Sequence, residues 1–257
     1  YARRMPPSSQ AFKLLPTRSP LVSIIVPTYN REKYLPAALD TVLSQSFSDF
    51  ECIVINDGSS DNTQEIIEKK LAEDERIISI HQINRGEYPT TNLGLRAAQG
   101  KYITWIHSDD LWPADTLAKR VATLENHSES DFTHGDIDKI DPEGNVIKTI
   151  PAEDWPAERM LADFFLPHSE RTHEYPVHHL SVMFRREFLT KTGYWDESLP
   201  YAGDLDWLIR AIKTGKAVKT PGLLYHYRQH PTSRMETDKK KINTTAVVEF
   251  ILNRYRS

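Results

Sequence analysis

Residues 101–115 read KYITWIHSDDLWPAD, an apolar run that ends abruptly in His-Ser-Asp-Asp before a proline. The run from Tyr102 to Ile106 is typical of a β-strand. Ligands of open α/β sheets bind outside the carboxyl ends of the strands, so Asp109 and Asp110 lie where chemistry is expected. Their oxygens suit Mg²⁺ or Mn²⁺, which also bind substrate phosphates. A turn that only caps the next helix is the competing interpretation.

Three upstream segments show the same pattern of an apolar strand followed by a polar cluster. They are LVSIIV at 21–26 before PTYN, FECIVI at 50–55 before NDGSSD, and a strand at 77–81 before NRG. Helices are expected between them, at 31–44 with Asn30 as cap, from Asp61 onward, and at 89–99 with Gly100 as stop. Right-handed crossovers make such a sheet parallel, and the polar clusters then share one crevice.

The second half of the chain is less regular. We expect a helix at 114–127, a strand at 131–140 ending in an Asp-Pro-Glu-Gly turn, and an irregular segment at 150–175 in which LADFFL is a candidate helix. Then follow a strand at 178–184, a helix ending at Gly193, a helix opening near Tyr201 and ending at Gly215, a strand at 223–228 and a terminal helix at 238–255. Residues 1–20 are proline-rich and predict an arm or linker.

Composition narrows the class of protein. The 257 residues suffice for one large α/β domain, and a net charge of -4 gives no electrostatic case for nucleic-acid binding. The single cysteine, Cys52, excludes a disulfide framework or a thiolate zinc site. A reducing compartment follows, so we expect a cytoplasmic location, with peripheral attachment at the inner face of the membrane as a variant. Neither a membrane span nor a signal peptide is evident, and the first residue is Tyr, so we expect part of a longer polypeptide.

Taken together, the clusters resemble those of the family 2 glycosyltransferases of the GT-A fold. The similar pieces lie between 21 and 233: VSIIVPTYNREKYLPAALDTVLSQSFSDFECIVINDGSSDNT, NRGEYPTTNLGLRAAQGKYITWIHSDD, GYWDESLPYAGDLDWLIRA and YHYRQHPTS. The resemblance implies a Rossmann-like, mostly parallel α/β sheet flanked by helices, with a smaller mixed region on the acceptor side. It divides the domain into a nucleotide-binding half at 21–127 and an acceptor-binding half at 128–235, followed by a C-terminal helix at 236–257.

The resemblance also implies an activity: metal-dependent, inverting transfer of a sugar from a nucleotide diphosphate sugar to a hydroxyl group. The donor is expected to be a UDP-sugar, the cation Mn²⁺ or Mg²⁺, and the acceptor a glycan or a lipid-linked molecule in polysaccharide biosynthesis. A bound cation stabilises the leaving diphosphate, and a carboxylate base takes the proton of the acceptor hydroxyl.

Carried over position by position, the resemblance implies nine donor-binding residues: Pro27, Thr28, Tyr29, Glu32, Asp57, Asn84, Arg85, Ser108 and Asp109. The first three line the base and ribose pocket, Asp57 accepts a hydrogen bond from the base, and Arg85 lies near it. Asp109 and His230 are the implied metal ligands.

Asp204 is the implied general base, and Asp206 is its rival on the same predicted helix. The family usually has Asp-x-Asp where this chain has His107-Ser108-Asp109. His107 removes one negative charge near the nucleotide, so donor recognition is expected to change while the metal-binding carboxylate stays.

The acceptor side offers weaker candidates. On a strand, His178 and His179 would alternate across its two faces, and His179 is the one we expect to face the acceptor. Trp195 and Tyr201 are suited to stacking on a sugar ring, although aromatic residues more often fill cores.

Two other functions compete with transfer. A sugar nucleotidyltransferase would share the crevice and the metal, but it needs a Gly-rich basic loop after the first strand, and PTYNREK is not one. The chain also contains no GxGxxG or P-loop motif. A non-catalytic nucleotide-sugar or glycan-binding module of a larger protein is the third reading.

Overall fold

The computed structural model describes residues 19–166, 177–234 and 242–256. Most of the predicted N-terminal arm therefore lies outside the described residues, as do parts of the segments at 150–175 and 238–255. Within the described parts, no helix combines the length and the apolar character needed to cross a membrane.

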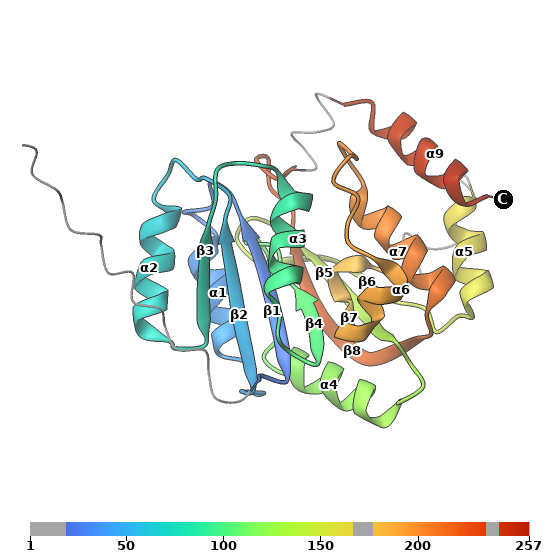
Figure 1. The fold of residues 1–257 in the computed structure, drawn as a ribbon, viewed down its shortest axis with the longest axis horizontal. Coiled ribbons are helices and arrows are strands. Elements are labelled where there is room, and N and C mark those ends of the chain that lie inside the picture. Colours follow the sequence, from blue (N-terminus) through green and yellow to red (C-terminus); the bar gives the residue numbers. More distant parts are fainter. Residues whose placement is uncertain (1–18, 167–176, 235–241, 257) are drawn as a thin grey trace, which may run out of the picture.

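Strands and helices alternate through the first half of the chain (Figure 1). The elements are β1 (Val22–Thr28), α1 (Leu35–Leu43), β2 (Phe50–Asn56), α2 (Thr63–Glu73), β3 (Ile77–His81), α3 (Glu87–Ala97), β4 (Tyr102–Trp105) and α4 (Thr116–Asn126). All four predicted strands are present, and β1 runs parallel to β2 and β4 while β2 runs parallel to β3. The prediction of a parallel sheet is confirmed for this half.

The second half adds a mixed region. Its elements are β5 (Phe132–Ile140), β6 (Val146–Ile150), α5 (Ala157–Phe165), the 3₁₀ turn η2 (His179–Ser181), β7 (Met183–Arg185), the 3₁₀ turn η3 (Arg186–Phe188), α6 (Leu189–Thr192), α7 (Gly203–Thr214), β8 (Ala217–Arg228) and α9 (Thr244–Tyr255). The strand order is β3-β2-β1-β4-β7-β5-β6, and β8 pairs with β5. Because β7 is antiparallel to both β4 and β5, the sheet is parallel on one side and mixed on the other.

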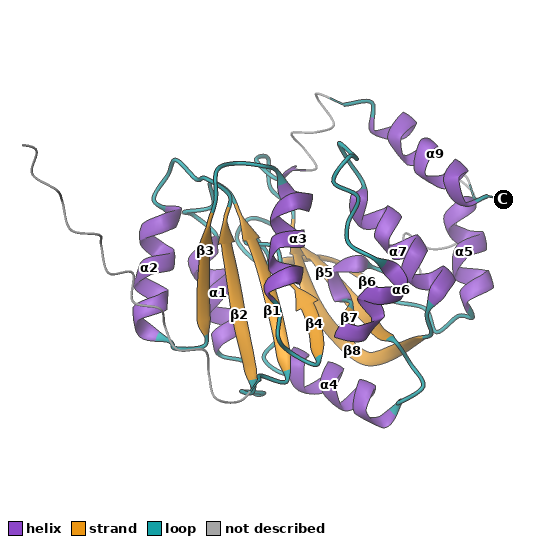
Figure 2. Cartoon of the chain, viewed as in Figure 1, coloured by secondary structure: helices purple, strands orange, loops and turns teal. Residues whose placement is uncertain are grey.

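The sheet has a core on each face, and helices cover both (Figure 2). Neighbouring residues of β1 divide between the two cores, because side chains alternate across a strand. Ile25 packs with α3 and with the helices of the second half, whereas Ile24 and Val26 pack with α1 and α4. Gly94 lets α3 approach the sheet, since a Cβ there would lie 2.5 Å from the Ile25 side chain.

The segment at 178–184 is not one strand, and this prediction was wrong. His178 Nδ1 accepts from the backbone N of Leu180, and its carbonyl oxygen accepts from the Ser181 hydroxyl. These local bonds compete with strand pairing and produce the turn η2. The rings of His178 and His179 consequently stack, with centroids 5.1 Å apart, instead of facing opposite ways.

The start of α1 also differs from the prediction. The helix begins at Leu35, and Asn30 adopts a left-handed backbone with φ 51° instead of capping it. The Asn30 side chain accepts from the backbone N of Ser60, which joins the loop after β1 to the loop after β2. Strand β6 was not predicted; its face is mostly exposed, and it is recognised by its pairing with β5.

Candidate functional site

The predicted site lies at the carboxyl ends of β1, β2 and β4, joined by the end of β8 and the start of α7. Strand β4 ends in a turn in which the backbone N of Asp110 donates to the carbonyl of His107 at 3.1 Å. The His-Ser-Asp-Asp cluster is thus presented on a turn, as the sequence predicted. The two adjacent carboxylates have very different surroundings.

Asp109 brings together residues from three parts of the chain. Its Oδ2 lies 3.0 Å from His230 Nε2 and 3.0 Å from Arg31 Nε. The His230 side chain is fully buried, its ring lies tilted against that of Tyr34 with centroids 4.5 Å apart, and its Nδ1 is 3.0 Å from Thr232 Oγ1. Burial alone would raise the pKa of Asp109, but the hydrogen bond with His230 and the charge of Arg31 lower it to about 2. The side chains of the two predicted metal ligands, Asp109 and His230, are therefore in contact.

Asp110 links the turn after β4 to β8 through two hydrogen bonds. Its Oδ2 accepts from the Tyr225 hydroxyl at 2.7 Å, and its Oδ1 accepts from the backbone N of Arg228 at 2.7 Å. Burial raises the pKa of Asp110 to about 7, with a further contribution from the Asp109 carboxylate. Sequence reasoning assigned Asp110 no separate role, because its partner Tyr225 is 115 residues away.

His107 lies between two acidic side chains. Its Nε2 is 3.5 Å from Glu87 Oε1, and its Nδ1 is 3.7 Å from Asp110 Oδ2. Burial opposes protonation of this imidazole, but the carboxylates of Glu87, Asp110 and Asp109 together raise the pKa of His107 above its usual value. The imidazole at this position is therefore surrounded by carboxylates, which favour its protonated form.

The donor set fits a divalent cation. One atom each of His107, Asp109 and Asp110 lies within 4.8 Å of the others, and carboxylate and imidazole ligands suit Mn²⁺. The sequence indicated Asp109 and Asp110 as carboxylates suited to such a cation, and the family resemblance implied Asp109 and His230 as its ligands; His107 was not predicted as a ligand. The position of His107 two residues before Asp109 in HSDD was the sequence signal that could have identified it.

Asp204 and Asp206 share the first turn of α7 but differ in exposure. Asp204 is 31 % exposed, and its Oδ2 lies 3.1 Å from His179 Nε2. Asp206 is only 2 % exposed; its Oδ2 binds Arg210 Nε at 3.0 Å, and its Oδ1 accepts from the Tyr255 hydroxyl at 2.8 Å. Asp206 is therefore held in a structural ion pair, whereas Asp204 is accessible.

His179 Nε2 approaches Asp204 Oδ2 closely without making a hydrogen bond within the described residues. Burial lowers the pKa of His179, which favours the neutral imidazole. The ring centroids of His107 and His179 are 6.1 Å apart. These two imidazoles therefore lie between the His-Ser-Asp-Asp turn and Asp204.

The predicted donor-binding residues lie at or after the carboxyl ends of β1, β2, β3 and β4. Thr28 is buried and its hydroxyl finds no partner among the described residues, while Tyr29 is 46 % exposed beside it. An unpaired buried hydroxyl is costly unless a ligand satisfies it, which fits a pocket there. The remaining predicted residues are a half-buried Pro27, a buried Ser108, the exposed Asn84 and Arg85, and the exposed Glu32, whose Oε2 accepts from the backbone N of Asn62.

Asp57 is buried and organises the loop after β3. Its Oδ1 accepts from Gln82 Nε2 at 2.7 Å and from the backbone N of Arg85 at 2.8 Å, and its Oδ2 accepts from the backbone N of Gly86 at 2.9 Å. A carboxylate offers about four acceptor positions, so one remains for another donor. Asp57 can therefore shape this loop and still bind a base.

The aromatic candidates of the acceptor side belong to the core. Trp195 is 2 % exposed and packs edge-on against Trp105, with ring centroids 5.4 Å apart. Tyr201 is partly buried against the same core.

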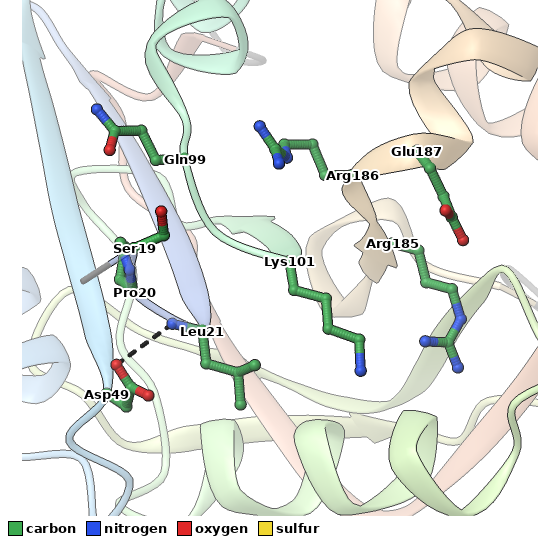
Figure 3. A pocket seen from close by; sticks show the side chains of 9 residues that line it. All are labelled: Ser19, Pro20, Leu21, Asp49, Gln99, Lys101, Arg185, Arg186 and Glu187. Atoms are coloured by element: carbon green, nitrogen blue, oxygen red, sulfur yellow. Dashed lines mark hydrogen bonds between the residues drawn. The ribbon is translucent and has the colours of Figure 1, made fainter.

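A separate hollow of about 370 Å³ lies at the opposite, amino-terminal edge of the strands (Figure 3). It contains none of the predicted site residues. Its lining side chains are already engaged in part: the backbone N of Leu21 donates to Asp49 Oδ1 at 3.3 Å, and Lys101 pairs with Glu125. We assign it no role.

Comparisons with known proteins agree with this arrangement. Residues 23–193 match Glycosyl transferase family 2. An uncharacterized glycosyltransferase of Haemophilus influenzae is 41 % identical over 133 residues, which is 51 % of this chain and 52 % of that protein. The uncharacterized glycosyltransferase EpsJ of Bacillus subtilis is 31 % identical over 227 residues, which is 86 % of this chain and 64 % of that protein. The chain thus spans between half and two thirds of the length of these relatives.

Solved structures show the same fold. TarS 1-349 of S. aureus in complex with UDP-GlcNAc has a TM-score of 0.68 at 22 % identity, covering 90 % of this chain and 65 % of that one. The mannosyltransferase PcManGT from Pyrobaculum calidifontis, in complex with GDP-Man and Mn²⁺, has a TM-score of 0.58 at 20 % identity, covering 93 % and 69 %. The predicted GT-A fold is confirmed, and the chain belongs to glycosyl transferase family 2.

Proposed function

We propose that this chain is a metal-dependent, inverting glycosyltransferase domain that uses a UDP-sugar and transfers the sugar to a hydroxyl of a glycan or lipid-linked acceptor. Residues 21–127 bind the nucleotide, and residues 128–235 bind the acceptor. The observation that carries the proposal is the pairing of Asp109 with His230 on one side of the site and an accessible Asp204 on the other.

The two carboxylates suit different tasks. Asp109, with its lowered pKa, stays ionised and is therefore suited to binding a cation. Asp204 has no Lys or Arg partner among the described residues, and its neighbour His179 favours the neutral form. A carboxylate that no cation neutralises remains able to accept a proton, whereas Asp206 is committed to Arg210.

In the proposed reaction the acceptor oxygen forms a bond to the anomeric carbon from the face opposite the diphosphate. The bond between that carbon and the diphosphate oxygen breaks, its electron pair leaves with the nucleotide, and the hydroxyl proton goes to the Asp204 carboxylate. Asp109 and His230, with His107 and Asp110 nearby, would hold a divalent cation, which when bound would neutralise charge on the departing diphosphate.

The known complexes support the choice of ligands. TarS has been solved with UDP-GlcNAc and PcManGT with GDP-Man and Mn²⁺. Thr28, Tyr29 and Asp57 stand at the ends of β1 and β2, where a base and ribose would lie.

A panel of nucleotide sugars, each with Mn²⁺ and with chelator, tests the proposal by release of free nucleotide. We expect turnover with one UDP-sugar that is lost in chelator and in Asp109→Asn. Calorimetry of Asp109→Asn should show weakened UDP binding in Mn²⁺ under conditions in which the variant is folded. Tight cation-dependent binding without any release or transfer, for every sugar and acceptor tried, would favour the non-catalytic binding module.

A further inference from the structure

Arg31 stands in the loop between β1 and α1 and faces the proposed cation ligand. Its Nε donates to Asp109 Oδ2 at 3.0 Å, and the two side chains are only 19 % and 14 % exposed. The Arg31 backbone N donates to Thr63 Oγ1 at 2.9 Å, and Nη1 donates to the carbonyl of Asn30 at 3.1 Å. The loop therefore holds this guanidinium against Asp109 by several independent bonds.

This pairing has consequences for a cation. A divalent ion at Asp109 would share the carboxylate with a guanidinium, and the two positive charges would repel at short range in a partly buried site. His107 adds to the difficulty, because it stands where the family has a carboxylate. A diphosphate would relieve the repulsion, since it brings negative charge to both cations.

Arg31 is also well placed for a diphosphate. It follows Tyr29, on the proposed base and ribose wall, by two residues and reaches across to Asp109. Its Nη2 makes no hydrogen bond within the described parts of the chain. Guanidinium groups bind phosphate oxygens through parallel N–H donors, and a free Nη2 supplies one.

We propose that Arg31 is a diphosphate-binding residue that occupies Asp109 until the donor arrives, so that the cation enters with the nucleotide and not before it. This rests on the proposed function, because it needs Asp109 to be a cation ligand. Arg31 then has opposite effects on the two ligands: it opposes the bare cation and favours the diphosphate.

Calorimetry of the full chain with three probes tests this: Mn²⁺ alone, UDP alone, and UDP in the presence of Mn²⁺. In Arg31→Met we expect Mn²⁺ alone to bind about tenfold more tightly and UDP alone about tenfold more weakly, as the loss of one charge-assisted bond implies. Lys33→Met is the matched control. It removes the same charge two residues away, from an exposed side chain over the Tyr34 ring, and should change neither affinity.

Arg31→Lys separates charge from geometry. The ammonium keeps the positive charge near Asp109, so Mn²⁺ alone should still bind weakly, but it lacks the fork of donors, so UDP should bind less tightly than in the wild type. This variant also keeps the test decisive if Arg31→Met folds poorly. Unchanged or weaker Mn²⁺ binding in Arg31→Met would overturn the proposal, as would equal changes in the Lys33→Met control.

Asp109→Asn distinguishes failure of this inference from failure of the proposed function. If Asp109→Asn loses the Mn²⁺ dependence of UDP binding while Arg31→Met shows no opposed changes, the cation site stands and the role of Arg31 is wrong. If Asp109→Asn keeps the full Mn²⁺ dependence, the cation site itself is wrong, and this proposal falls with it.

Discussion

At the scale of single residues, partners rather than residue type separate the roles of the aspartates. Asp109 and Asp110 are adjacent, yet Asp109 contacts His230 and Arg31, whereas Asp110 is buried and accepts a hydrogen bond from Tyr225. Asp110 has no exposed surface and both of its oxygens already accept hydrogen bonds, which gives it a structural role. The chemistry of the site is therefore assigned by exposure and charge at each position.

Replacing Asp204 with Asn should lower kcat and kcat/KM together by about 10²- to 10⁴-fold, because a general base acts in the transition state. UDP affinity and the melting temperature should stay at the wild-type values. Steady-state kinetics and calorimetry check both halves of the expectation. If Asp204→Asn retains near-normal transfer while Asp206→Asn is inactive with unchanged stability, the base is Asp206.

Asp57→Ala should weaken UDP binding more than binding of inorganic diphosphate in Mn²⁺. An unpaired donor on the base costs about 1 to 3 kcal/mol, and only UDP carries a base. The variant also frees the backbone N of Arg85 and of Gly86, which has φ 92°. Calorimetry with the two ligands makes the comparison. Equal losses for UDP and diphosphate would contradict recognition of the base by Asp57 and would leave it only the role of holding the loop after β3.

At the scale of elements, the start of α3 supports the start of α7. The Tyr88 hydroxyl accepts from the backbone N of Gly203 at 2.9 Å, directly before Asp204. Gly203 is needed for this approach, since a Cβ there would lie 2.9 Å from the Tyr88 ring. Ala202 has a left-handed backbone with φ 57°, a strained conformation for a residue with a side chain. Tyr88 is thus a positioning residue for Asp204.

Tyr88→Phe keeps the ring and removes only the hydroxyl. We expect kcat to fall about tenfold to a hundredfold, because a small misplacement of a catalytic group is costly, while KM for the donor and the melting temperature change little. Tyr102→Phe is the matched control. It loses a buried hydroxyl bonded to Glu125 at the far end of β4 and should leave kcat unaffected. Similar kcat values for both variants would refute the positioning role.

At the scale of the whole molecule, the mixed half of the sheet and its helices bring Asp204 to the site, whereas Asp109 comes from the parallel half. Helix α9 packs against α7, and Asp206 joins them through Tyr255. Arg254 adds a bond to Asp196, in the segment before α7. The C-terminal helix is therefore part of the domain core, with Ile251 fully buried.

Asp206→Asn should destabilise the chain by about 1 to 3 kcal/mol, since it removes charge-assisted bonds from a buried group. Urea denaturation measures the loss, and limited proteolysis should cut near α9 earlier than in the wild type. The kcat of the folded fraction should remain near normal. A stability equal to that of the wild type would mean that the contact between α7 and α9 does not depend on this carboxylate.

The first half of the fold was predictable because its signals are local. Apolar runs of β-branched residues marked β1, β2 and β3, and helical spacing marked the four buried residues of α1, namely Leu35, Ala38, Leu39 and Val42. The clusters PTYN, NDGSSD and HSDD indicated the edge at which a ligand binds. Where side-chain bonds to the backbone override periodicity, as at His178, the prediction failed.

The sequence by itself thus determined the fold class, the family and the edge of the sheet that carries the candidate site. Only the tertiary structure decided what each side chain there touches. Arg31 and Asp109 are separated by 78 residues, Asp110 and Tyr225 by 115, and Tyr88 and Gly203 by 115. Periodicity and motif spacing describe neighbours along the chain, whereas these pairs are set by strand order and by helix packing across the sheet.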